Sequence, residues 1–308
     1  MDTLLFDLSV WSQIQITGVD RKSFLQSFCT NDIIKLDSGA VCEAFIPDIK
    51  GKILGHLFVV AEDEHLTLLA VPGSNETVAP HLTKYLLGVE AEVHDTTSDT
   101  ALLCLAGDNV ADFIGETVSL ELNQGKKIEL GGTSVLIVRV DITNFPTYLI
   151  SGSREEIQIA QLHLLEKGVS VGTDSQFERL RIEAGFPFAG MDISEANIAQ
   201  EAARTEQTIS FTKGCYLGQE PIARLDAMGH TNKELRGLVI EAESVSIGAS
   251  VLAEEKEVGT ITSVAQRDDG TSVGFAILRT KFAKPGTSLV VTDAVGTYPA
   301  TVFWPRLG

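Results

Sequence analysis

The stretch 41–72, VCEAFIPDIKGKILGHLFVVAEDEHLTLLAVP, contains three apolar runs that are separated by two short polar segments. DIKG at 48–51 and AEDE at 61–64 are prone to form turns, and the runs around them are rich in β-branched and aromatic residues. Runs of this kind, bounded by turn signals, are typical of β-strands. The stretch therefore predicts three consecutive strands of one sheet.

Helices and further strands flank this stretch on both sides. Apolar residues at helical spacing predict a short helix from Asp20 and a longer one over 74–88. Residues 4–16 and 91–94 are expected to form strands. The order is then roughly β-α-β-β-α-β, which is the split βαβ order of ferredoxin-like domains.

The rest of the chain predicts a second half of the same design and a third part of another kind. Strands and helices after residue 100 repeat the order without obvious sequence identity. From Leu235 onward, short alternating strands with frequent glycine are typical of a small β-barrel or sandwich. We therefore predict an α+β protein with two ferredoxin-like (split βαβ) domains, 1–98 and 99–232, and a C-terminal β-barrel, 233–308.

The charge and the cysteines limit the classes of function. A formal net charge of −18 repels phosphate backbones and anionic lipids, so we expect neither nucleic acid nor a membrane as a partner. The four cysteines are scattered, without the paired spacing of a disulfide framework, a zinc site or a stable iron–sulfur cluster site. No secretory signal or membrane-spanning run is evident, so a cytoplasmic location is expected.

Glu183 is the first candidate site residue. Ser175 and Glu178 stand in the S-x-x-E relation of a capping box, which predicts a helix that starts there and ends near Gly185. A carboxylate at the C-terminal end of a helix is opposed by the helix dipole, which suggests a partner from outside the helix. A solvated Glu183 is the alternative.

The segment 213–224, KGCYLGQEPIAR, is the second candidate region. Lys213 lies two residues from Cys215, and a nearby cation favours a reactive thiolate, although a buried and inert thiol is the alternative. The segment also brings together an amide, a carboxylate and a guanidinium, which would suit a flat heterocycle with a carboxylate tail. These three groups belong to Gln219, Glu220 and Arg224.

KGCYLGQE closely resembles the signature of the YgfZ-type folate-binding proteins, which are relatives of the aminomethyltransferase T-protein of the glycine cleavage system. The resemblance extends over almost the whole chain, from GVDRKSFLQ and TND, through DIKGKIL and ERLRIEAGFPFAGMDI, to GTITSVAQ in the last part. It implies two ferredoxin-like domains and a β-barrel arranged as a ring, with tetrahydrofolate or a derivative entering the hole at the centre of the ring.

The resemblance also implies roles for particular residues. Glu183 is similar to the acidic residue that hydrogen-bonds the pteridine ring, Arg236 to an arginine that helps to hold the folate, and Cys215 to the motif cysteine. We therefore expect Cys215 as a functional thiol and no metal ligands. The expected folate-binding set is Glu183, Arg236, Lys213, Tyr216, Gln219, Glu220 and Arg224.

One departure from the T-protein concerns its adjacent aspartates, one of which methylene transfer needs. At the matching place this chain has Gly55 and His56. Glycine cannot replace a carboxylate that stabilises developing positive charge. Glycine-cleavage aminomethyltransferase activity is therefore disfavoured.

Three functions of different classes follow. The resemblance implies a folate-binding protein that supports assembly or repair of iron–sulfur clusters in client enzymes, with reduced folate and those client or assembly proteins as partners. The alternatives are a one-carbon transferase of the T-protein kind and a folate-binding protein without chemistry of its own. The missing carboxylate favours the first over the second, and the motif thiol favours it over the third.

Overall fold

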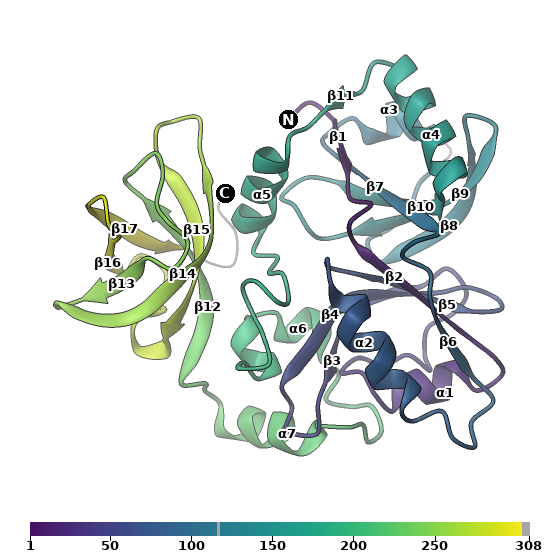
Figure 1. Ribbon diagram of the computed structural model, residues 1–308, viewed down its shortest axis with the longest axis horizontal. Helices are drawn as coiled ribbons and strands as arrows, with labels where there is room; N and C mark the ends of the chain where they lie inside the picture. Colours follow the sequence, from purple (N-terminus) through teal and green to yellow (C-terminus); the bar gives the residue numbers. More distant parts are fainter. Residues whose placement is uncertain (116–117, 304–308) are drawn as a thin grey trace.

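A computed structural model describes residues 1–115 and 118–303 of the chain. Figure 1 shows three parts around a central connecting segment: a sheet domain at lower right, a second sheet domain at upper right and a barrel at left. The predicted α+β class with a ring of two split βαβ halves and a barrel is confirmed. In the described part of the chain, no helix is both long enough and apolar enough to span a bilayer.

The first sheet has five strands in the order β3-β4-β5-β2-β6. The stretch 41–72 forms three of them, as predicted, in antiparallel pairs. Two helices cover one face, and Val78 and Leu82 of the second are fully buried in the core of this half. The bounds are β2 (Ser12–Thr17), α1 (Arg21–Gln26), β3 (Val41–Pro47), β4 (Ile53–Ala61), β5 (Leu66–Ala70), α2 (Ser74–Thr83) and β6 (Glu92–Asp95).

The second sheet has six strands in the order β11-β1-β7-β10-β9-β8. Its outer face is covered by helices α3 and α4, and α4 begins at a capping box formed by Ser153 and Glu156. The bounds are β1 (Leu4–Asp7), β7 (Thr100–Ala106), α3 (Val110–Ile114), β8 (Gln124–Leu130), β9 (Thr133–Val140), β10 (Thr147–Ser153), α4 (Arg154–Glu166) and β11 (Ser170–Val171).

The single strand expected over 4–16 is wrong, because this stretch forms two strands in different sheets. β1 pairs with β7 of the second sheet, and β2 pairs with β5 and β6 of the first. Between them, Trp11 is 1% exposed in a core cluster to which both sheets contribute. The large apolar area of this side chain is buried only where the sheets meet, which accounts for the break. The domain boundaries near residues 98 and 232 stay a prediction.

The C-terminal part is a closed barrel of six antiparallel strands, as predicted, in the order β12-β15-β14-β13-β16-β17. Closure leaves no open sheet edge. Residues 304–308 of the predicted barrel domain lie outside the described residues. The bounds are β12 (Lys233–Ile240), β13 (Ser250–Ala253), β14 (Lys256–Gln266), β15 (Ser272–Arg279), β16 (Ser288–Thr292) and β17 (Thr297–Phe303).

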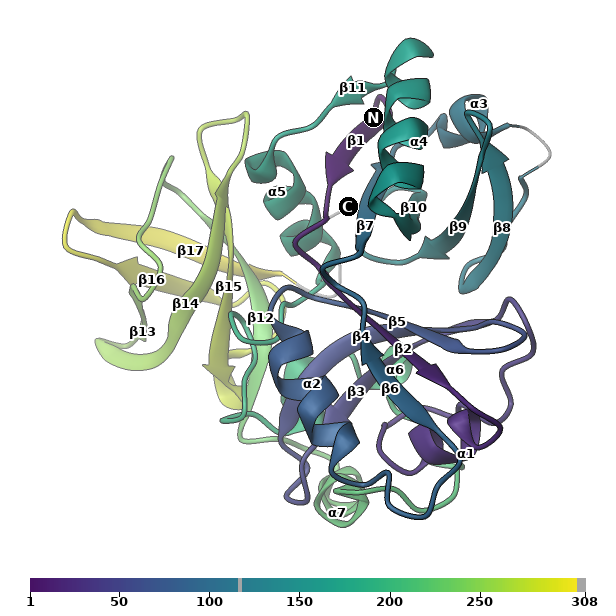
Figure 2. The ribbon, with the colours of Figure 1, turned by 45° about the vertical axis from the view of Figure 1, so that its right-hand side comes forward.

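The segment between the second sheet and the barrel runs through the middle of the molecule. In Figures 1 and 2, α5 (Asp174–Ala184) lies between the barrel and the second sheet, and α7 (Gln219–Met228) lies beside the first sheet at the bottom. Short helical turns connect them: η1 (Ala199–Ala202) and α6 (Thr205–Thr208). All three parts of the ring are therefore tied together by this segment.

Two buried arginines anchor the central segment. Arg181 of α5 is fully buried and donates to Asp192 Oδ2 at 2.7 Å and to Ser263 Oγ of barrel strand β14 at 2.8 Å. Arg204 donates from Nε to Glu43 Oε1 at 2.5 Å and from Nη2 to Glu43 Oε2 at 2.6 Å. Because Glu43 belongs to β3, one arginine joins the segment to the barrel and the other joins it to the first sheet.

We expect Glu43→Gln to destabilise the protein strongly, because it leaves the buried Arg204 guanidinium without a counter-charge. Loss of one partner of a buried pair costs about 3–5 kcal/mol of unfolding free energy. Burial alone would raise the pKa of Glu43, but Arg204 and His56 outweigh burial and lower it from 4.5 to about 2. Because the folded-state pKa is depressed, this stabilisation is present above about pH 4.5 and is lost as the pH falls towards 2.

Chemical denaturation at pH 7 and through this acid window measures both effects, and the variant should show a shallower loss of stability with acid. Asp268→Asn is the control, since Asp268 is paired with Arg179 but its side chain is 94% exposed. An exposed pair contributes at most about 1 kcal/mol. Equal losses for the two variants would contradict an anchoring role for Glu43.

Candidate functional site

Glu183 lies one residue before the end of α5, against the barrel. The predicted capping box at Ser175 and Glu178 is wrong: the box is formed by Thr173 and Gln176, two residues earlier. The predicted end at Gly185 is confirmed by its left-handed φ of 78°. A helix can start at any residue whose side chain reaches the N3 amide, and here threonine does so.

The partner of Glu183 comes from outside its helix. Arg267, which follows strand β14, donates from Nε to Glu183 Oε1 at 3.2 Å, and the glutamate side chain is 17% exposed. The solvated alternative therefore does not describe this residue. A carboxylate offers about four lone-pair sites, so one ion pair leaves capacity for further N–H donors.

Arg236 lies on barrel strand β12, where neighbouring oxygen atoms accept hydrogen bonds from its guanidinium. Nε donates to Ala283 O at 2.9 Å, Nη1 to Leu235 O at 2.7 Å and Nη2 to Glu234 Oε2 at 2.6 Å. These partners all belong to the barrel. Arg236 thus contributes to the barrel wall in this structure.

Lys213 is buried, whereas Cys215 is exposed. Its ammonium donates to the carbonyl oxygens of Gln26, Cys29 and Asn31 at 2.7, 2.8 and 2.7 Å, which uses all three of its protons. Burial lowers the pKa of Lys213. The nearest recorded thiol is Cys29 Sγ at 3.7 Å, so this lysine holds the loop after α1 against the motif.

Cys215 is the exposed cysteine of the four, and the other three are buried. Burial raises the pKa of the Cys29 thiol and of the Cys42 and Cys104 thiols, which disfavours the reactive thiolate at those positions. Cys215 is therefore not the buried thiol of the alternative. Whether this thiol functions stays a prediction.

Tyr216 and Gly218 fix the rest of the motif to the first sheet. Tyr216 is buried beneath the Lys213 ammonium, 4.9 Å from the ring centroid, and burial raises its pKa to about 12. Gly218 has a φ of 78°, and a Cβ there would lie 2.2 Å from Asp48 O in the turn between β3 and β4. Only glycine fits this approach, and α7 begins directly after it. The sequence analysis did not predict this helix.

Gly55 and His56, which the resemblance matched to the T-protein aspartates, are both enclosed by packing, and neither supplies a carboxylate. A Cβ on Gly55 would lie 2.4 Å from Val78 Cγ2 of helix α2, so the packing leaves no room for a side chain. His56 is fully buried, with Nε2 2.6 Å from Glu43 Oε1 and Nδ1 2.9 Å from Pro187 O. Both ring nitrogens are engaged in the anchor of the central segment.

Two cavities flank the turn between β3 and β4. The first, here called the central cavity, has a volume of about 380 Å³ and lies between β4, the start of α2 and the central segment. The second, the α7 cavity, has a volume of about 570 Å³, and Glu220 and Arg224 line it. Ile53, Leu54, Ser74, Thr77, Ala189 and Gly190 are among the residues that line the central cavity.

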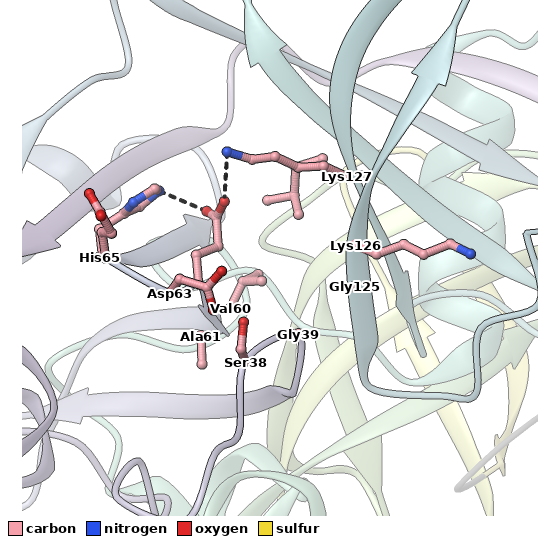
Figure 3. Close-up of a pocket in the computed structure, with 12 residues that line it drawn as sticks. Ser38, Gly39, Val60, Ala61, Asp63, His65, Gly125, Lys126 and Lys127 are labelled. Carbon is pink, nitrogen blue, oxygen red and sulfur yellow. Dashed lines mark ion pairs between the residues drawn. The ribbon is translucent and has the colours of Figure 1, made fainter.

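A third cavity, of about 560 Å³, lies between the two sheet domains (Figure 3). Glu62 of the first domain stands between His65 and Lys127, with Oε1 2.8 Å from His65 Nε2 and Oε2 3.3 Å from Lys127 Nζ. Lys127 comes from β8 of the other half, so no spacing in the sequence signals this cluster. Among the described residues, no three His, Cys, Asp or Glu side chains are grouped to hold a metal ion.

For the described residues, the predicted site set is distributed over three places. Glu183 contacts the β14–β15 turn, Arg236 lies in the barrel wall, and the motif 213–224 packs on the first sheet. Glu220 and Arg224 share one cavity, whereas Lys213 and Tyr216 are buried in packing roles. The sequence also gave no sign of the Glu43–His56–Arg204 cluster, whose members are far apart along the chain.

Two family models match nearly the whole chain. Residues 2–213 match the GCVT N-terminal domain, and residues 233–306 match the glycine cleavage T-protein C-terminal barrel domain. The chain therefore belongs to the glycine cleavage T-protein family. Within it, the chain is a relative of the YgfZ type, as the following similarities indicate.

The tRNA-modifying protein YgfZ of Yersinia pseudotuberculosis serotype IB (strain PB1/+) is 28% identical over 306 residues, which cover 95% of this chain and 89% of that protein. A putative chloroplastic transferase of Arabidopsis thaliana is 26% identical over 309 residues, covering 95% and 69%. The crystal structure of the glycine cleavage system aminomethyltransferase T from Bartonella henselae has a TM-score of 0.87 at 20% identity, covering 98% of this chain and 85% of that chain. This last likeness establishes the fold.

We expect Gly218→Ala to destabilise the protein, whereas Gly214→Ala in the same motif should not. At Gly218 the left-handed backbone alone costs about 1–3 kcal/mol for alanine, and the contact with Asp48 O adds to this. A Cβ on Gly214 would meet no atom within 4 Å, so stability there should be unchanged or rise by up to about 1 kcal/mol. Urea denaturation measures both, and equal midpoints would contradict the docking role of Gly218.

Proposed function

We propose that this protein binds a reduced folate without transferring an aminomethyl group and supports iron–sulfur clusters in client enzymes. The observation that carries the proposal is the pair Gly55 and His56 within a T-protein fold. Val78 fills the space beside Gly55, and both nitrogens of His56 are bonded. A folate held in this fold would therefore meet no carboxylate at the position where the T-protein has its aspartates.

The folate would bind along the central segment, which carries Glu183 and part of the wall of the central cavity, with its pteridine ring hydrogen-bonded by Glu183. The central cavity, of about 380 Å³, is within the size range of small-molecule sites. Lys213 and Tyr216 would act by positioning the motif loop, because both are buried. Tetrahydrofolate or a derivative is the proposed ligand, with Arg236 and Gln219 as the remaining proposed contacts. Glu220 and Arg224, which the sequence also predicted to hold folate, line the separate α7 cavity and are left out of the proposed contacts.

Cys215 would provide the thiol for the iron–sulfur role. Its side chain is exposed, so a partner protein or a cluster could reach it. The YgfZ relatives are named for tRNA modification. A chain with a net charge of −18 is poorly suited to hold tRNA itself, so we assign it an indirect role, through the enzymes that it maintains.

Tetrahydrofolate should bind the purified protein with measurable heat and raise its melting temperature. Glu183→Gln should weaken binding about ten- to a hundred-fold, because it removes a charge-assisted hydrogen bond worth about 1.5–3 kcal/mol. Isothermal titration measures the affinities. Glu155→Gln, an exposed change on α4, is the control and should leave binding unaltered. An absence of both heat and thermal stabilisation for the unaltered protein would refute folate binding.

Cys215→Ser should keep the fold and the folate affinity but fail to restore iron–sulfur enzyme activity in cells that lack the native protein. The change replaces one exposed small side chain by another, so neither stability nor the central cavity is altered. Thr212→Ala, another exposed position three residues away, is the control and should restore activity fully. Full restoration by Cys215→Ser would remove the thiol from the proposal and leave folate binding intact.

A further inference from the structure

The α7 cavity is built from segments that are far apart along the chain. The turn between β3 and β4 contributes Lys50 and Lys52, the central segment contributes Ile198 and Glu201, and the connection to the barrel contributes residues 231–232. The remaining wall is α7 itself. It contributes Glu220, Pro221, Arg224, Leu225 and Met228.

The wall that α7 supplies contains an apolar stripe between its charged residues. Pro221, Leu225 and Met228 recur at i, i+4 and i+7, so they lie on one face of the helix. Ile222 is the buried residue of α7, whereas Met228 remains 54% exposed. An apolar stripe beside a cavity of about 570 Å³ offers surface for a small molecule with an apolar body.

Cations of this cavity are available for a ligand. In the described part of the chain, the Arg224 guanidinium and the Lys50 ammonium have no recorded hydrogen-bond or ion-pair partner, and Lys52 donates to Ala196 O at 2.8 Å. Glu201 accepts bonds from Asn197 and from the Ile198 amide, within its own turn.

The balance of charge distinguishes this cavity from the others described. Its lining holds three cations and two carboxylates, whereas the cavity between the sheet domains holds three carboxylates and two lysines, and the central cavity holds one carboxylate and no lysine or arginine. This local excess of positive charge occurs in a chain whose net charge is −18. A low-polarity wall next to unpaired cations favours an anion over a neutral ligand of the same shape.

We propose that the α7 cavity is a second ligand site, which takes a small organic anion with an aromatic or alicyclic body and a carboxylate. The body would lie on Pro221, Leu225 and Met228, and the carboxylate would be held by the fork of Arg224 with support from Lys50. The volume suits a small molecule rather than a peptide segment.

A backbone wall separates this site from the central cavity. Lys52 pairs with Ile198 in an antiparallel bridge, and the Ile53 amide donates to Asn197 O at 3.2 Å. Lys52 and Ile198 line the α7 cavity, whereas Ile53 lines the central cavity on the other side. The second site is therefore distinct from the folate site proposed above and does not depend on it.

Titration with naphthalene-2-carboxylate, followed by its fluorescence and by calorimetry on the full chain, tests the site. The probe should bind at least about ten-fold more tightly than the neutral 2-naphthalenemethanol. Arg224→Gln should abolish this preference for the anion, and Met228→Glu should weaken both compounds. Lys256→Gln, which removes an exposed cation of the barrel, is the matched control and should change neither.

Saturating tetrahydrofolate should leave probe binding unchanged. The proposal is overturned if the probe does not bind at millimolar concentration, if the neutral compound binds equally well, or if Arg224→Gln has no effect. Displacement of the probe by tetrahydrofolate would overturn the distinction between the two sites. Because Arg224 and Met228 are exposed, these variants should retain the unaltered melting temperature, which excludes unfolding as the cause.

Discussion

The buried pair between Arg204 and Glu43 is the constraint on which the arrangement of the ring depends. Two charges taken out of water are tolerated only when their hydrogen bonds are nearly complete. The same guanidinium also donates to Gly185 O at 3.2 Å, where α5 ends. The first sheet thereby sets the position of the helix that carries Glu183, and through Arg181 and Ser263 it sets the position of the barrel.

The same pair also fixes the surroundings of Gly55 and His56 on strand β4. His56 uses Nε2 to bond Glu43 and Nδ1 to bond Pro187 O. Both ring nitrogens therefore help to hold the central segment against the first sheet. Gly55 allows Val78 of α2 to approach the strand directly. A carboxylate at position 55 would therefore require α2 to move.

Local patterns in the sequence predicted much of the fold, whereas contacts between distant segments could not be predicted. Alternating apolar runs with turn residues identified β3, β4 and β5, and frequent glycines identified the barrel. The split of residues 4–16 depends on Trp11, whose burial requires both sheets. In the motif, residue types indicated a ligand for Glu220 and Arg224, but the burial of Lys213 depends on carbonyl groups more than 180 residues earlier.

The exchange of β1 into the second sheet has a consequence for how the chain acquires its structure. β1 pairs with β7, so about 100 residues of the first domain intervene between these partners. Pairing over such a sequence separation raises the contact order and slows folding. The second sheet is complete only when β1 has paired with β7 across the length of the first domain. A cut in the peptide between the two α+β halves would therefore leave β1 on the fragment that lacks the rest of its sheet.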